Sequence, residues 1–202
     1  MSAAESSVGP ALAMLAIGAV PLGLRALDAL AKEAPVDVLA AGTVESGLYL
    51  IAFAGEVEPC LRAYAAARRV AAAALEDQVL LPYAEARIVP AFVAGVRRSG
   101  PGDTVGVVET LFPPTLLAAL DAALKGAEVE LVELRVGDGL GGKAVATLWG
   151  ATHDVEAALA LAERALAGGR AEGSSTTIVP NADDLVGRAL RAGSRFGKEW
   201  RG

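Results

Sequence analysis

The sequence of this chain contains two similar halves. Residues 12–39 (LAMLAIGAVPLGLRALDALAKEAPVDVL) align without a gap with residues 105–132 (VGVVETLFPPTLLAALDAALKGAEVELV). Two pairs of residues recur 93 positions apart in this alignment: Asp28 with Asp121, and Lys32 with Lys125. Farther along, the separation grows to 95, where Gly47 matches Gly142 and Gly55 matches Gly150, and then to 98, where Pro82 matches Pro180. So small a drift over half of the chain indicates the duplication of one domain.

The boundary between the copies lies in residues 97–103 (RRSGPGD), whose Gly-Pro-Gly is a turn signal. We therefore expect a first domain over residues 11–98, a second over 103–192 and a C-terminal tail over 193–202. Each copy predicts the order strand, helix, strand, strand, helix, strand, helix. This order is typical of an α+β domain in which helices cover a small sheet.

The second copy shows its helices most clearly. Pro113 and Pro114 can only begin a helix, because proline has no N–H to donate in a helix interior. The leucines of this helix recur every four residues and predict its apolar face: Leu116, Leu120 and Leu124. The matching helix of the first copy has an apolar set of the same kind: Val20, Leu24, Leu27 and Ala31. Asp154 is expected to open a later helix of the second copy as its N-cap.

Composition and charge exclude several classes of protein. Hydrophobic residues make up 53% of the chain and aromatic residues only 4%, which predicts a closely packed core of small side chains. The net charge of −6 and the lack of a basic stripe argue against binding to nucleic acid. The apolar run of residues 11–24 is too short to cross a bilayer and contains Pro21. A single cysteine, Cys60, rules out an internal disulfide and suits the reducing cytosol. We expect a cytoplasmic protein without a membrane partner.

Residues 135–150 (RVGDGLGGKAVATLWG) hold glycines in a G-x-G-x-x-G pattern: Gly137, Gly139 and Gly142. In a dinucleotide-binding fold this loop opens a helix whose N-terminus binds the phosphates. Here the loop leads into KAVATLW, which reads as a strand. The glycines therefore favour a strand-to-strand connection that needs positive φ angles. A second interpretation is that backbones of several chains crowd together at this loop.

These segments in succession resemble the shell proteins of bacterial microcompartments, in the tandem-domain, trimer-forming class. The resemblance rests on VGVVET, AALDAALKGAEVELV, the glycine loop followed by KAVATLWG, and DVEAALALAERAL, with weaker versions in the first copy. It extends from about Leu12 to about Leu190. The resemblance implies two tandem ferredoxin-like BMC domains, each a small antiparallel sheet covered by helices.

The resemblance further implies a structural tile of the shell. Three chains would place six domains around a central pore that passes small metabolites. The loop between the second and third strands lines that pore in the family, which assigns to it Glu45, Ser46, Gly47, Leu140, Gly141 and Gly142. Small residues would keep the opening free where six loops converge. Glu45, present three times at the rim, would favour cations or uncharged metabolites.

The family's edge lysine, which contacts the neighbouring tile, corresponds to Lys32 and Lys125. Taken alone, each is an ordinary lysine at a helix C-terminus. The family often follows the fourth strand with Pro-Arg, but this chain has Pro82-Tyr83 and Pro180-Asn181, so no arginine partner is assigned. The expected partners are two further copies of the chain, other shell proteins edge to edge, and encapsulated enzymes.

No group of residues in the sequence indicates catalysis, a metal site or a cofactor site. His153, the only histidine, is expected at an exposed helix start, and Cys60 as a small buried residue. Neither predicted pore loop has a cysteine, so we predict no iron–sulfur cluster of the kind that some tandem members hold. Two alternatives stay open: a soluble trimeric ligand-binding or regulatory protein with duplicated ferredoxin-like domains, and an enzyme that binds a nucleotide at the glycine loop.

Overall fold

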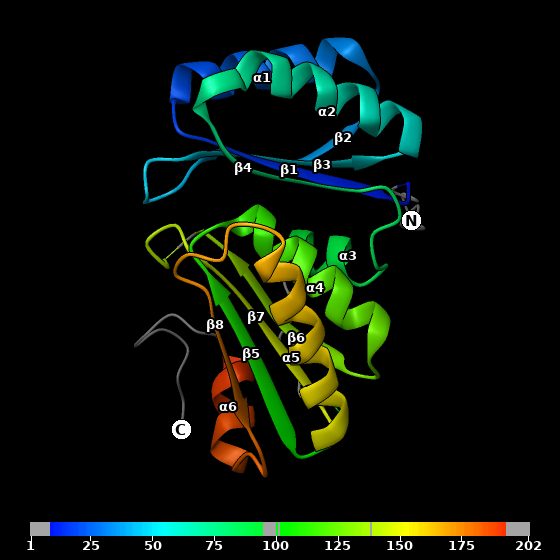
Figure 1. Ribbon diagram of the computed structural model, residues 1–202, viewed down its shortest axis with the longest axis vertical. Helices are drawn as coiled ribbons and strands as arrows, with labels where there is room; N and C mark the ends of the chain where they lie inside the picture. Colours follow the sequence, from blue (N-terminus) through cyan, green and yellow to red (C-terminus); the bar gives the residue numbers. More distant parts are fainter. Residues whose placement is uncertain (1–8, 95–99, 101, 138, 193–202) are drawn as a thin grey trace, which may run out of the picture. The chain divides into compact units, whose positions relative to one another are not determined.

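The structure is a computed structural model and describes residues 9–94, 100, 102–137 and 139–192 (Figure 1). Contacts divide the chain into two units. Of the described residues, the first unit comprises 9–43 and 47–84, and the second comprises 44–46 and those from 85 to 192. The expected tail over 193–202 lies outside the described residues.

The first unit is a four-stranded sheet with helices packed on it. Its elements are β1 (Ala11–Ile17), α1 (Val20–Glu33), β2 (Asp37–Thr43), β3 (Tyr49–Gly55), α2 (Val57–Ala71), a 3₁₀ turn η1 (Ala72–Ala74) and β4 (Leu75–Leu81). The strand order is β2-β3-β1-β4, and all neighbours are antiparallel. Helices α1 and α2 lie side by side over one face of the sheet (Figure 1).

The second unit repeats this plan. Its elements are α3 (Ile88–Ala94), β5 (Thr104–Thr110), α4 (Pro113–Gly126), β6 (Glu130–Val136), β7 (Ala144–Gly150), α5 (Thr152–Ala167), β8 (Ser175–Val179) and α6 (Asp184–Ala192). The strand order is β6-β7-β5-β8, again antiparallel throughout. The predicted α+β class is therefore confirmed, and α4 begins at the predicted Pro113.

The duplication extends to irregular features of the backbone. Strands β2 and β6 both shift register against their partner strand, between Val38 and Ala40 and between Leu131 and Glu133. These positions are 93 residues apart, as in the sequence alignment. A bulge kept at the same place in both copies adds local twist to the same edge of each sheet.

Small side chains build the core of the first unit, as the composition predicts. Alternate residues of β1 face the helices: Ala11, Ala13, Leu15 and Ile17. They pack against Ala26 and Leu30 of α1 and against Cys60, Ala63 and Ala67 of α2. Cys60 is fully buried, which confirms its interpretation as a small core residue.

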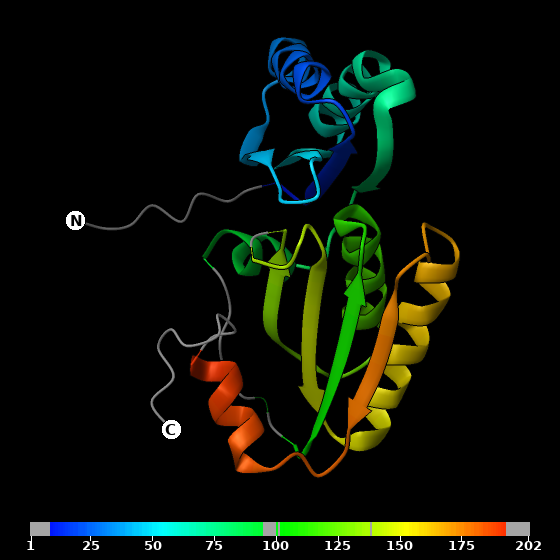
Figure 2. The ribbon, with the colours of Figure 1, turned by 90° about the vertical axis from the view of Figure 1, so that its left-hand side faces the viewer.

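In the second unit both faces of the sheet are covered. The side chains of Val155 and Leu159 in α5 lie against Gly106 of β5. On the other face, Val186 and Leu190 of α6 pack on a cluster of Val105, Val132 and Trp149. Figure 2 shows α6 and α5 on opposite sides of this sheet.

Two sequence predictions about helices need correction. Helix α5 begins at Thr152, and Asp154 lies in its first turn, where its charge favours the helix dipole without capping the helix. In α1 the buried residues are Gly23, Ala26 and Leu30, whereas Val20 and Leu24 of the predicted face are 36% and 54% exposed. In α4 the predicted face is correct: Leu116, Leu120 and Leu124 are at most 4% exposed.

Candidate functional site

The first predicted pore loop connects β2 to β3 through residues 44–48. Glu45, Ser46 and Gly47 are all exposed. Gly47 has a φ of +83°, and a Cβ atom placed there would meet no atom within 4 Å. The backbone conformation therefore requires glycine here, although the space around it does not.

The second loop connects β6 to β7 through residues 137–143 and is two residues longer. It closes through a hydrogen bond from the Gly137 N–H to the Lys143 carbonyl at 2.8 Å. Four of its glycines have a positive φ: Gly137, Gly139, Gly141 and Gly142, at +76°, +69°, +63° and +87°. The loop joins two strands and opens no helix, so it lacks the anion-binding geometry of a dinucleotide site.

The second unit brings four of the six predicted pore residues together. The Glu45 carboxylate (Oε2) accepts a hydrogen bond from the Gly141 N–H at 2.6 Å. A Cβ atom at Gly142 would collide with the Ser46 side chain, whereas a Cβ at Gly141 would meet nothing within 4 Å. Gly142 therefore permits a close approach between the two loops of one chain. The crowding of several chains at this loop stays a prediction.

The two predicted edge lysines each form an ion pair with an aspartate one helical turn earlier. Lys32 lies 2.7 Å from Asp28 at the end of α1, and both side chains are largely exposed, at 75% and 61%. Lys125 lies 2.7 Å from Asp121 at the end of α4, where the aspartate side chain is only 11% exposed. The two pairs thus have the same geometry in different surroundings.

The surroundings of Asp121 come from a segment that the sequence analysis left unassigned. The backbone N–H of Glu85 donates to Asp121 Oδ1 at 2.8 Å. Two residues later, the Arg87 guanidinium donates to the Val129 carbonyl at 2.6 Å and to the Leu124 carbonyl at 3.1 Å. Its Nε donates to Glu85 at 2.9 Å. A cation at the last carbonyls of α4 satisfies orphan acceptors and favours the helix dipole.

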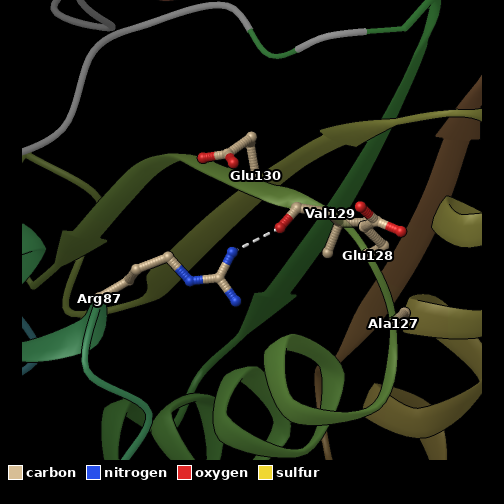
Figure 3. A pocket seen from close by; sticks show the side chains of 5 residues that line it. All are labelled: Arg87, Ala127, Glu128, Val129 and Glu130. Atoms are coloured by element: carbon tan, nitrogen blue, oxygen red, sulfur yellow. Dashed lines mark hydrogen bonds between the residues drawn. The ribbon is translucent and has the colours of Figure 1, made fainter.

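Figure 3 shows the Arg87 side chain reaching toward the Val129 carbonyl, with Glu128 and Glu130 nearby. These residues and Ala127 line a hollow of about 280 Å³. Every guanidinium nitrogen of Arg87 already has a protein acceptor. Arg87 therefore attaches the segment before α3 to α4 and to the residue that precedes β6.

The single histidine and the single cysteine belong to different units. His153 is 82% exposed at the start of α5, as predicted, next to Asp154. Burial, with smaller contributions from Asp37 and Glu56, raises the pKa of the Cys60 thiol to about 11, so the thiol is a poor nucleophile. In the described part of the chain, no three acidic, histidine or cysteine side chains are grouped to hold a metal. No described helix has the length and apolar character needed to span a bilayer.

Comparison with known proteins links this geometry to a family. The model of the BMC domain matches the chain twice, over residues 11–83 and 104–182. The bacterial microcompartment shell protein PduT of Citrobacter freundii is 28% identical over 183 residues, which is 91% of this chain and 98% of that protein.

Solved structures agree with this link. A microcompartments protein from Desulfitobacterium hafniense DCB superposes with a TM-score of 0.75 at 28% identity, covering 88% of this chain and 98% of that one. A fused permuted hexameric shell protein of the RMM microcompartment shares the fold alone, with a TM-score of 0.54 at 22% identity and coverage of 78% and 81%. The chain is thus homologous to a microcompartment shell protein, and because the family model matches both repeats in order, it belongs to the BMC domain family.

Proposed function

We propose that this chain is a structural protein of a bacterial microcompartment shell, and that three copies close into a ring of six domains around a pore. One observation supports the ring: corresponding apolar residues of the two repeats differ in how far they are buried. Leu117 of α4 and Leu131 of β6 are fully buried, whereas their counterparts Leu24 of α1 and Val38 of β2 are 54% and 42% exposed. The first repeat thus presents an apolar surface whose counterpart in the second repeat is covered.

A contact between two different surfaces is heterologous, and such contacts close into rings when the rotation per step divides the circle. Two repeats per chain and three chains give the six positions of a pseudohexamer. The exposed surface of α1 and β2 is then covered by the next chain. The proposed domains are residues 11–98 and 103–192, as expected from the sequence.

The pore of this ring is lined by the two hairpin loops. Its residues are Glu45, Ser46, Gly47, Leu140, Gly141 and Gly142. The close approach of Gly142 to Ser46 supports a place where loops converge. Three copies of Glu45 give the rim a negative potential, which favours cations and uncharged metabolites over anions.

Lys32 and Lys125 form the outer edge and meet neighbouring tiles of the same shell. Other shell proteins are therefore the partners at the edge, and encapsulated enzymes are candidate partners at a face. The protein has no catalytic role in this proposal, and neither nucleic acid nor a membrane takes part. Homology to a shell protein supports a structural role.

Negative-stain electron microscopy of the purified chain, together with its mass in solution, tests the proposal. We expect hexagonal particles with a central dimple and a mass of about 61 kDa, three times the 20.4 kDa of one chain. Some particles should join edge to edge. Compact particles without a hexagonal outline would favour the ligand-binding alternative, and a test of ligand binding at the loops would follow.

A further inference from the structure

The contact that the residues after β4 make with α4 has a recognisable local structure. We name residues 84–88 the 84–88 segment. Three hydrogen bonds shape it: Ala84 N–H to the Pro10 carbonyl at 2.8 Å, Arg87 N–H to Glu85 Oε2 at 2.9 Å, and Ile88 N–H to the Glu85 carbonyl at 3.0 Å. This shape directs the Glu85 N–H to Asp121 Oδ1.

The residues after β8 have the same local structure, and we name them the 182–186 segment. Their three bonds join Ala182 N–H to the Asp103 carbonyl at 2.6 Å, Leu185 N–H to Asp183 Oδ1 at 2.8 Å, and Val186 N–H to the Asp183 carbonyl at 2.8 Å. Each atom pair has its counterpart in the first repeat. Asp183 therefore corresponds to Glu85, and Leu185 corresponds to Arg87.

The aspartate acceptors Asp121 and Asp28 also correspond, but only Asp121 accepts a backbone hydrogen bond within the described residues. Asp121 binds Lys125 through Oδ2 and the Glu85 N–H through Oδ1. Asp28 binds Lys32 through Oδ2 in the same way. Its Oδ1 has no donor among the described residues, and its side chain is 61% exposed. Asp183, on the donor side, is also exposed.

We propose that Asp28 is the acceptor for a second copy of this chain, whose 182–186 segment docks on α1 through the Asp183 N–H. The inference rests on the proposed ring and names the residues at which its chains meet. Leu185, which is 48% exposed, then lies over the end of α1, where Arg87 lies over the end of α4. In the contact between chains, burial of the apolar Leu185 side chain thus replaces the hydrogen bonds of Arg87. The aspartate acceptor is present in both contacts.

The substitution Asp28→Ala tests this contact, with Glu58→Ala on the exposed face of α2 as a control of equal charge change. Mass photometry or sedimentation over a concentration series gives the concentration at which trimers dissociate. A hydrogen bond to a charged acceptor predicts an increase of about ten- to a hundredfold per contact for Asp28→Ala, and no change for the control. Circular dichroism of both variants reports whether the chain itself still folds.

Cross-linking gives a second test that leaves Asp28 intact. Ala31 and Leu185 correspond to Leu124 and Arg87, which are in contact within one chain. The double variant Ala31→Cys/Leu185→Cys, treated with a short bismaleimide, should give covalent bands of two and three chains. Each single-cysteine variant should give one chain only, since Cys60 is buried.

The outcomes separate the inference from the proposed function. If the unmodified chain is not a trimer, the ring fails and the inference fails with it. If the unmodified chain is a trimer, but Asp28→Ala dissociates like the control and no bands of higher mass form, the ring stands and this contact is wrong.

Discussion

At the scale of single residues, the second hairpin loop shows why glycines gather where they do. Gly141 and Gly142 both have a positive φ, but only Gly142 also lies against another loop, at Ser46. The first feature could be expected from a glycine-rich connection between strands. The second depends on a residue about a hundred positions away, which no local pattern contains.

The substitution Gly142→Ala should lower the free energy of unfolding by about 2 kcal/mol. A left-handed backbone costs an L-residue roughly 1–2 kcal/mol, and the new methyl group collides with Ser46. Urea denaturation measured by tryptophan fluorescence gives the value. Gly42→Ala is the matched control, because a Cβ there meets no atom within 4 Å and its φ is not left-handed. Equal midpoints for the two variants would contradict the role given to Gly142.

Cys60 predicts a dependence of stability on pH. Burial raises the pKa of the folded thiol from 9.0 to about 11, so the unfolded chain loses this proton first as the pH rises. The unfolding free energy should therefore be constant below about pH 9 with respect to this group, and fall between about pH 9 and 11. Chemical denaturation at several pH values should show a shallower fall for Cys60→Ala. The same slope in both proteins would show that Cys60 is not its source.

At the scale of elements, the sequence predicts the order and type of helices and strands well, because apolar periodicity and proline positions act locally. It predicts the buried face of α4 correctly and that of α1 wrongly. Val20 and Leu24 recur at helical spacing just as the leucines of α4 do. Both side chains are nevertheless exposed within the described chain. Periodicity alone therefore could not show which face of α1 packs on α2.

The pore and edge roles of the candidate site stay predictions. The loops and lysines could be chosen from the alignment of the repeats with the help of a family resemblance. Arg87 was missed because the expected arginine directly follows a proline, and this one stands five positions after Pro82. A comparison of residues 84–88 with 182–186 would have singled it out, since Leu185 occupies its place in the second repeat.

The substitution Arg87→Ala should loosen the attachment of α3 to β6 and lower the unfolding free energy by about 2 kcal/mol. It removes three hydrogen bonds from a charged donor: one to Glu85, and two to the carbonyls of Leu124 and Val129, which then lose this donor. Limited proteolysis within residues 84–94 should become faster, and the urea midpoint should fall. Arg62→Ala, on the exposed side of α2, controls for the loss of one cation. Unchanged proteolysis would mean that other contacts hold α3.

At the scale of the whole molecule, the edge role that we propose for Lys32 and Lys125 predicts an assembly property that differs from folding. Lys32→Ala/Lys125→Ala should still form trimers, but sheets of tiles should need at least about fivefold more protein, as expected for a loss of about 1 kcal/mol per contact. Electron microscopy over a concentration series measures this threshold. Arg62→Ala/Arg164→Ala removes the same charge from the exposed sides of α2 and α5, not from the proposed edge lysines, and should leave the threshold unchanged. A similar rise in both variants would assign the effect to net charge.

The position of Arg87 also affects the order in which a tile would be built. Its acceptors, Leu124 and Val129, belong to the same polypeptide, so their contact forms at a fixed effective concentration as each chain folds. The proposed contacts between chains would have Leu185 instead, which is 48% exposed, and would form only by collision. In the proposed ring, the Arg87 contacts would therefore be complete before any two chains meet. The concentration of the chain in the cell would then limit only the contacts between chains, and with them the number of finished tiles.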